Sequence, residues 1–161
     1  MFKLLRKQAR LYQTRFSFGA SSAIITNMGL IIGLSHSLNA RISIIASILV
    51  IALADNISDS FGIHMYQESE RLKRREVWLS TSTNFLTRLL VSLTFIALVY
   101  LLPFDTVVVA SITWGLLLLT FMSYTIAKDE EVNPYFAIAE HLGIAIFVII
   151  LSKLVGMLII R

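Results

Sequence analysis

The sequence of 161 residues contains no cysteine and only two prolines and seven glycines. Without cysteine, the chain has no disulfides, no thiolate metal ligands and no thiol nucleophile. It also lacks a glycine-rich phosphate loop, a nucleophile elbow and an HExxH zinc helix, which identify many soluble enzymes. We therefore do not expect an enzyme. Hydrophobic residues make up 57 % of the chain, above the roughly 45–50 % typical of soluble domains.

Long apolar runs predict an all-α integral membrane protein with five transmembrane helices. Each run is about 20 residues long, the length that crosses the hydrocarbon core of a bilayer. The predicted spans cover residues 17–35, 42–63, 85–102, 106–127 and 135–160. Pro103 and Pro134 fit the end of the third span and the start of the fifth. Residues 1–16 would form a basic interfacial segment ahead of a single transmembrane domain, residues 17–161.

Lysine and arginine alternate between the connections and so predict the orientation. The turn after the first span carries only Arg41, and the turn near residue 103 carries no base. The basic residues gather instead in the N-terminal segment and between the second and third spans: Lys3, Arg6, Lys7, Arg10, Arg15, Arg71, Lys73, Arg74, Arg75 and Arg88. The N-terminus is therefore predicted to be cytoplasmic and the C-terminus outside. The same bases suit anionic lipid headgroups, and we expect the bacterial cytoplasmic (inner) membrane and no nucleic-acid partner.

Two acids within the second span, Asp55 and Asp59, are the strongest functional signal. An ionised carboxylate in the hydrocarbon layer costs at least about 2.5–3.5 kcal/mol, so two of them require a partner or a water-filled path. They lie one helical turn apart on one face, bordered by Asn56 and Ser58. Such oxygen ligands suit hard divalent cations and protons. The alternative is a buried hydrogen-bond network that fixes helix packing.

Other polar side chains extend the predicted pathway. Asn27 and Met28 on the first span are candidate ligands opposite the aspartates. His64, Glu68 and Glu140 lie near the cytoplasmic edge and are a candidate entrance. The sequence favours the other interpretation of His64 and Glu68, a solvated pair on the helix surface.

Three glycines are predicted helix-packing positions. Gly29 and Gly33 form a small-xxx-small pattern, which lets two helices approach closely. Gly62 continues the aspartate stripe. The close approach occurs either within one subunit or across a dimer axis. Residues 67–78 are expected to continue the second helix beyond the bilayer as a solvated, charged extension.

The order of these segments resembles the vacuolar iron transporter family, also called the yeast calcium-cross-complementer type, over nearly the whole chain. Residues 18–33 are similar to the family's glycine-rich first helix. Residues 51–70 are similar to its second helix and acidic extension, and three further spans follow with a proline turn. The resemblance implies a homodimer with an iron and manganese pathway between the first and second helices of both subunits. It also implies proton-coupled export from the cytosol.

The sequence departs from this family at its metal-binding acids. Ser22 and Ala23 stand where the family has aspartate and glycine, and Ile63 stands where it has glutamate. The cytoplasmic metal-collecting domain between the second and third spans is missing as well. The family's two carboxylates therefore have no counterpart here, and Asp55 and Asp59 are this chain's own substitutes.

These features together predict a homodimeric transporter that exports a divalent metal cation, Fe²⁺ or Mn²⁺, by proton coupling and without a resident cofactor. One alternative is the same scaffold with another substrate, in which Asp55 and Asp59 serve as a proton relay. A second alternative is a non-transporting scaffold subunit that recruits a partner through its basic cytoplasmic loop.

Overall fold

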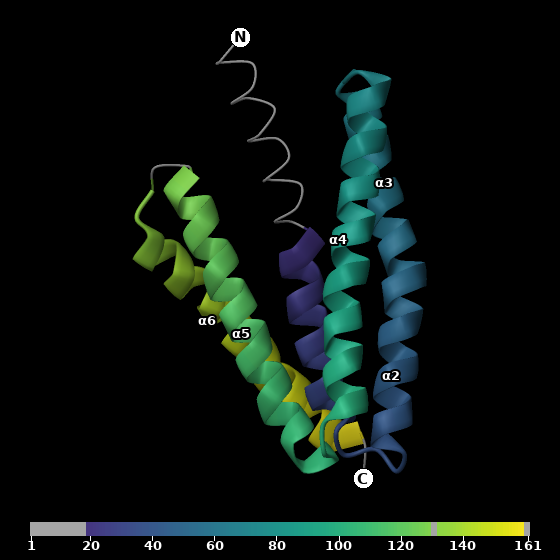
Figure 1. Cartoon of the computed structure of the whole chain (residues 1–161), viewed down its shortest axis with the longest axis vertical. Helices are drawn as coiled ribbons and strands as arrows, with labels where there is room; N and C mark the ends of the chain where they lie inside the picture. Colours follow the sequence, from purple (N-terminus) through teal and green to yellow (C-terminus); the bar gives the residue numbers. More distant parts are fainter. Residues whose placement is uncertain (1–18, 130–131, 160–161) are drawn as a thin grey trace.

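The computed structural model describes residues 19–129 and 132–159, which form a bundle of long helices (Figure 1). The first helix covers Gly19–Leu34. The next helical stretch joins α2 (Ala40–Val50), the π-helical turn η1 (Ile51–Asp55) and α3 (Asn56–Ser69). It is followed by α4 (Arg74–Leu101), α5 (Phe104–Asp129) and α6 (Pro134–Ile159). The described part of the chain contains no strand, as an all-α protein requires.

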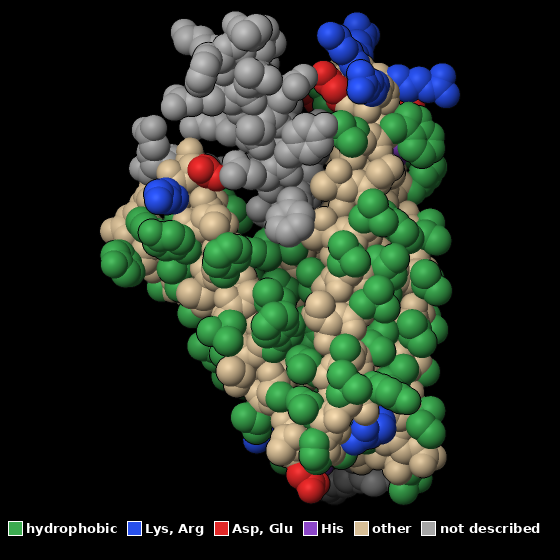
Figure 2. All heavy atoms as spheres, viewed as in Figure 1, with side chains coloured by type: hydrophobic (Ala, Val, Ile, Leu, Met, Phe, Trp, Pro, Cys, Tyr) green, Lys and Arg blue, Asp and Glu red, His purple; other side chains and the backbone are tan. Residues whose placement is uncertain are grey.

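Four helical stretches are long and apolar enough to cross a membrane, and the first helix is a shorter apolar one. The helix content and the apolar helix lengths thus confirm the prediction of an all-α membrane protein. Hydrophobic side chains cover the visible face along most of its length (Figure 2). α6 is the most extreme case, because Ala145 and Gly156 are its only buried residues within the described range. The predicted N-terminal segment, residues 1–16, lies outside the described residues.

The first helix occupies the centre of the bundle, as Figure 1 shows between α4 and the α5–α6 pair. Its core residues Ala20, Ile24, Met28 and Ile31 are all at most 1 % exposed. A Cβ added to Gly29 would lie 3.0 Å from Ser152 of α6. A Cβ on Gly156 would lie 2.4 Å from the carbonyl oxygen of Gly33. The small residues at 29 and 33 therefore allow close packing against α6 within this chain.

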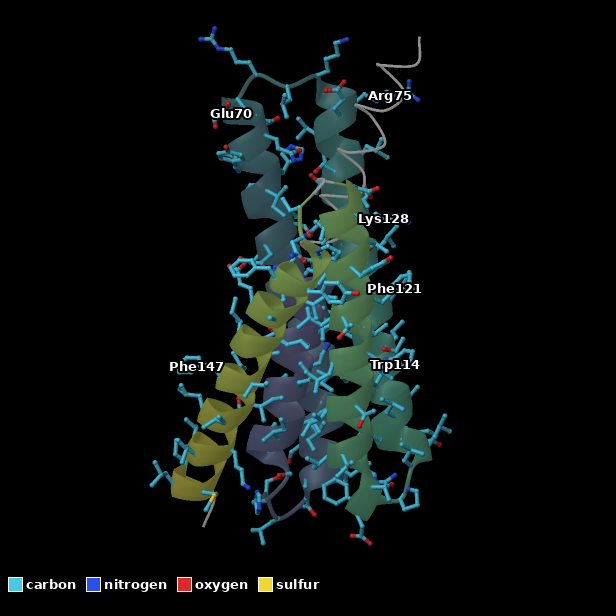
Figure 3. All side chains as sticks on the ribbon, turned by 90° about the vertical axis from the view of Figure 1, so that its left-hand side faces the viewer. Glu70, Arg75, Trp114, Phe121, Lys128 and Phe147 are labelled. Carbon is cyan, nitrogen blue, oxygen red and sulfur yellow. The ribbon has the colours of Figure 1, made fainter. Side chains whose placement is uncertain are left out.

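The connection between the second and third spans is shorter than predicted. The second helix ends at Ser69, not near residue 78, and α4 begins at Arg74, well before residue 85. Only residues 70–73 make the turn, in which Arg71 adopts a φ of 54°. The polar residues of this region stay helical because α3 and α4 lie side by side and bond to each other. Figure 3 shows Glu70 and Arg75 at the tip of this helix pair.

At the opposite end of the bundle, Arg41 of α2 bonds to the end of α4. Its guanidinium donates to the carbonyl oxygens of Tyr100 at 2.9 Å and Leu102 at 2.8 Å. These carbonyls lie at the end of α4, where the helix supplies no N–H partner of its own. The bond therefore joins α2 to the end of α4.

Candidate functional site

A buried arginine, Arg88, lies between the two aspartates that the sequence singles out. Its side chain on α4 is 4 % exposed. Nη2 donates to Oδ2 of Asp55 at 2.7 Å, and Nη1 donates to Oδ2 of Asp59. From the sequence, Arg88 is assigned to the bases of the cytoplasmic connection. This assignment is wrong, because the residue lies within the bundle. We call these three residues the charge cluster; its formal charge is −1 when both acids are ionised.

The charge cluster lies far from both ends of the helices that carry it. Arg88 is about 20 Å from either end of α4, at a rise of about 1.5 Å per residue. The hydrocarbon core of a bilayer is about 30 Å thick. A position halfway along a helix of this length therefore falls within the core if α4 spans the membrane.

The two ends of the charge cluster differ in exposure. The arginine is enclosed, whereas the side chains of Asp55 and Asp59 are 50 % and 42 % exposed. No hydrogen bond to the Oδ1 atoms of Asp55 and Asp59 is found within the described residues. Within the described part of the chain, these two carboxylates, one on η1 and one on α3, therefore each keep one acceptor oxygen free.

Asp55 is the last residue of the π-helical turn η1. In η1 the backbone N–H of Asn56 bonds to Ile51, five residues back, rather than to Ala52. The Ala52 carbonyl that this turn frees accepts a hydrogen bond from the Asn56 side chain at 3.2 Å. The same amide donates to the Phe85 carbonyl of α4 at 2.8 Å. Asn56, 0 % exposed, thus stabilises the wide turn and ties it to α4.

Polar contacts continue from Asn56 toward the α3–α4 turn. Ser60 donates to Asn56 at 3.4 Å and accepts from Asn84 at 3.1 Å. Farther along, Gln67 donates to Ser80 at 2.7 Å. The interface between α3 and α4 is therefore polar over several turns, whereas large hydrophobic side chains such as Phe61 and Met65 are exposed outside it.

The remaining predicted ligands do not gather around the aspartates. Asn56 is used by the backbone contacts described above, and Ser58 lies on the exposed side of α3. Asn27 donates to Ser92 of α4 at 2.9 Å, and its buried oxygen has no hydrogen-bond partner among the described residues. Met28 packs against Gly115 of α5. The described residues contain no group of three or more His, Cys, Asp or Glu side chains that could hold a metal ion.

The three predicted entrance residues do not all lie together either. His64 is only 8 % exposed, so a solvated surface position is wrong for it. Its Nδ1 lies 3.1 Å from the Thr81 hydroxyl and its Nε2 lies 3.4 Å from the exposed Glu68 carboxylate. Glu140 is exposed on α6, which packs on α5 and the first helix rather than on α3. It therefore does not join His64 and Glu68. Gly62 faces open space within the described chain and packs against nothing.

Sequence reasoning missed the residues of α4 that complete the site. Its buried polar side chains recur every three or four positions, the spacing of one helix face: Ser80, Asn84, Thr87, Arg88 and Ser92. This spacing is the signal that could have placed them in a helix interface rather than in a cytoplasmic loop.

Comparison of the chain with models of protein families, with curated proteins and with solved structures finds no match. The resemblance to the vacuolar iron transporters therefore depends on the sequence features described above.

Proposed function

We propose that the protein is a membrane transporter in which the charge cluster couples substrate movement to proton transfer. The observation that carries this proposal is the double ion pair of Arg88, which is enclosed within the bundle. Charged side chains within membrane-spanning segments commonly mark ion pathways and proton relays. With a charge of −1, the cluster takes up one proton and becomes neutral. Protonation of either aspartate releases that acid from Arg88 while the other acid keeps the pair.

The geometry supports a proton relay better than a metal site. A divalent cation at Asp55 and Asp59 would compete with the guanidinium that already contacts both acids. It would also lack further charged ligands, because the described residues offer no third acid or histidine there. Mg²⁺ or Ca²⁺ takes about six or more oxygen ligands, and the two carboxylates alone do not supply them.

Export of Fe²⁺ or Mn²⁺ is the second candidate, and the exposure of the two carboxylates favours it. Half-exposed acids within the bilayer require a cover other than lipid, because hydrocarbon offers them no hydrogen bonds. A second copy placed against this face of α3 would bring the free oxygens of four carboxylates together. A homodimer would thus supply ligands that one chain lacks.

The arrangement in the membrane completes the proposal. We infer five spans, with the first helix as the additional one, a cytoplasmic N-terminus and an outside C-terminus. The basic residues of the α3–α4 turn support this orientation by the positive-inside rule. The bacterial cytoplasmic membrane is the proposed location.

Proton flux in liposomes tests the proposal. The purified protein is reconstituted with an internal pH dye and an imposed pH gradient, and Mn²⁺, Fe²⁺, Na⁺ or K⁺ is added in turn. We expect one of these cations to dissipate the gradient in the wild type but not in Asp55→Asn or Asp59→Asn. Asp105→Asn, an exposed acid at the start of α5, is the matched control and should retain the flux.

The identity of the cation that dissipates the pH gradient distinguishes the candidate functions. A response to Mn²⁺ or Fe²⁺ supports metal export, and a response only to a monovalent cation supports the relay with another substrate. Equal flux in the wild type and both aspartate variants would refute the role of the charge cluster. Absence of flux together with a co-purifying protein would support the scaffold alternative instead.

A further inference from the structure

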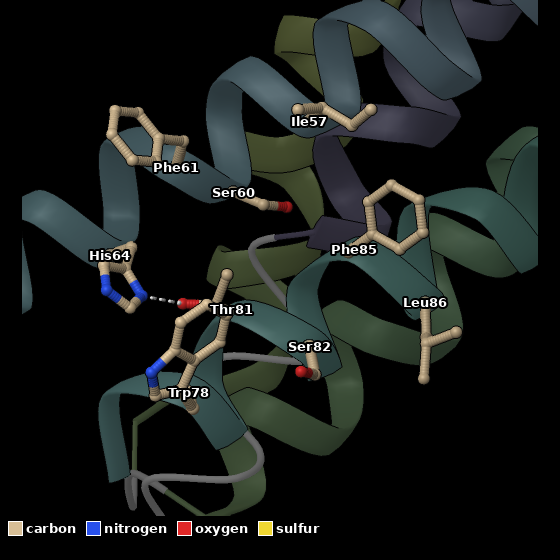
Figure 4. Close-up of a pocket in the computed structure, with 9 residues that line it drawn as sticks. All are labelled: Ile57, Ser60, Phe61, His64, Trp78, Thr81, Ser82, Phe85 and Leu86. Atoms are coloured by element: carbon tan, nitrogen blue, oxygen red, sulfur yellow. Dashed lines mark hydrogen bonds between the residues drawn. The ribbon is translucent and has the colours of Figure 1, made fainter. Parts of the chain in front are cut away.

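A groove of about 510 Å³ opens between α3 and α4, beside the polar contacts of their interface (Figure 4). Its walls include Ile57 and Phe61 of α3 and Trp78, Phe85 and Leu86 of α4. We call this the α3–α4 groove. Its volume falls within the range of small-molecule sites, roughly 300–1,000 Å³. The groove is a separate feature from the charge cluster, whose residues do not line it.

The lining of the α3–α4 groove is suited to an apolar chain. Aromatic and aliphatic side chains dominate it, and its polar groups are largely engaged elsewhere. His64 contacts Thr81, and Ser60 bonds to both Asn56 and Asn84. A ligand with many hydrogen-bonding groups would find few partners here. Apolar burial would therefore supply most of the binding free energy.

One end of the α3–α4 groove approaches a cluster of cations. Arg74 lies four residues before Trp78 on α4, so it occupies the same helix face one turn nearer the tip. The tip carries three further bases, Arg71, Lys73 and Arg75, and all four are exposed. Within the described part of the chain, none of these four bases forms an ion pair with an acidic side chain. Figure 2 shows these Lys and Arg side chains at the tip of the α3–α4 pair.

We propose that the α3–α4 groove binds an acyl chain of an anionic phospholipid, whose phosphate headgroup lies against Arg74 and the adjacent bases. Basic sites at helix ends attract anionic headgroups, and the groove provides an apolar slot directly below them. This arrangement complements both parts of the lipid.

The same charges disfavour two other occupants. A second copy in parallel orientation would bring its own bases toward this tip. The N-terminal residues 1–16 carry five bases, so they would also be repelled from Arg74. An anionic lipid has the opposite charge and is present at high concentration in the membrane.

Tryptophan fluorescence offers a direct test, because the chain has only Trp78 and Trp114. Trp114→Phe leaves Trp78 in the groove as the single reporter, and Trp78→Phe leaves Trp114 on α5. Trp114 is 37 % exposed and so is also accessible to lipid. Each variant is reconstituted in vesicles of phosphatidylglycerol and phosphatidylcholine at fixed ratio. Bromine, a quencher, is placed on the chains of one lipid or of the other.

We expect Trp78 to select phosphatidylglycerol about fivefold over phosphatidylcholine, the factor that ~1 kcal/mol from one basic side chain gives. Trp114 should show quenching in proportion to the bulk lipid mixture. In the Trp114→Phe background, Arg74→Gln should remove the selectivity at Trp78, while Lys153→Gln on α6 should preserve it.

A second pair of variants tests occupancy of the groove without changing charge. Leu86→Trp would fill the groove, whereas Leu90→Trp, one turn along α4, adds the same bulk to an exposed position outside it. Native mass spectrometry should detect retained phosphatidylglycerol on the wild type and Leu90→Trp, but not on Leu86→Trp. Equal quenching of Trp78 by both lipids would overturn the proposal. Protection of Trp78 from both lipids would also overturn it, because a protein segment or a second copy would then cover the groove.

Discussion

The stability of charge-cluster variants should be strongly non-additive. Asn at either Asp55 or Asp59 alone leaves Arg88 paired with the other acid, and the cluster becomes neutral. We expect each single variant to cost only about 1 kcal/mol of unfolding free energy, the net contribution of a typical intramolecular hydrogen bond, because Arg88 keeps its other partner. The double variant Asp55→Asn/Asp59→Asn leaves the guanidinium without a charge partner while it is 4 % exposed. Breaking a buried pair in this way costs about 3–5 kcal/mol.

Removal of the arginine should cost less than removal of both acids. Arg88→Gln leaves two acids, each of which can become neutral by binding a proton, whereas an unpaired guanidinium stays charged. We expect a loss of about 2 kcal/mol, less than half the upper value for a fully buried pair. The triple variant, in which all three residues are neutral, should recover much of the stability that the double variant loses.

Reversible unfolding in detergent or lipid mixtures measures these differences, with Asp105→Asn as the control for loss of an acid outside the cluster. The expected non-additivity arises from coupling between the two aspartates through Arg88. If the costs of the two single variants simply add to that of the double variant, the aspartates act independently and the charge cluster does not exist as a unit.

The packing contacts give two further predictions. Asn56→Leu removes two buried amide hydrogen bonds that hold the π-helical turn, so we expect a loss of about 1–3 kcal/mol. A thermal scan should show this loss, and an unchanged midpoint would contradict the role of Asn56. Gly156→Ala places a methyl group 2.4 Å from the Gly33 carbonyl oxygen and should cost about 1–3 kcal/mol through overpacking. Gly62→Ala meets no atom within 4 Å and should instead stabilise the helix by about 0.5–1 kcal/mol; the opposite order of the two glycine variants would refute the packing.

The membrane fold class and the aspartate pair could be predicted from the sequence because each depends on local composition. Runs of apolar residues identify helices that can cross a membrane whatever their neighbours are. Asp55 and Asp59 stand out because few other charges interrupt the second run. The prediction failed at the third helix, where Ser80 and Asn84 make the start of α4 resemble a polar loop.

The partner of the aspartates could not be predicted, because it depends on the register between two helices. Hydropathy does not fix how far α4 slides along α3, so Arg88 was indistinguishable from the bases of the nearby turn. His64 is misjudged for the same reason. It shares one face of α3 with Asn56 and Ser60, and this face, not the aspartate face, is buried.

Infrared titration of the protein in bilayers tests most directly whether the charge cluster carries the transported proton. Acidification should produce the carbonyl band of a protonated carboxylic acid, since one aspartate takes up a proton while Arg88 retains the other. We expect the wild type to show a component of this band, in addition to the bands of its other acids, that is absent from the Asp55→Asn/Asp59→Asn double variant and present in Asp105→Asn. An identical band in the wild type and the double variant would contradict it, because the proton would then reside on another acid.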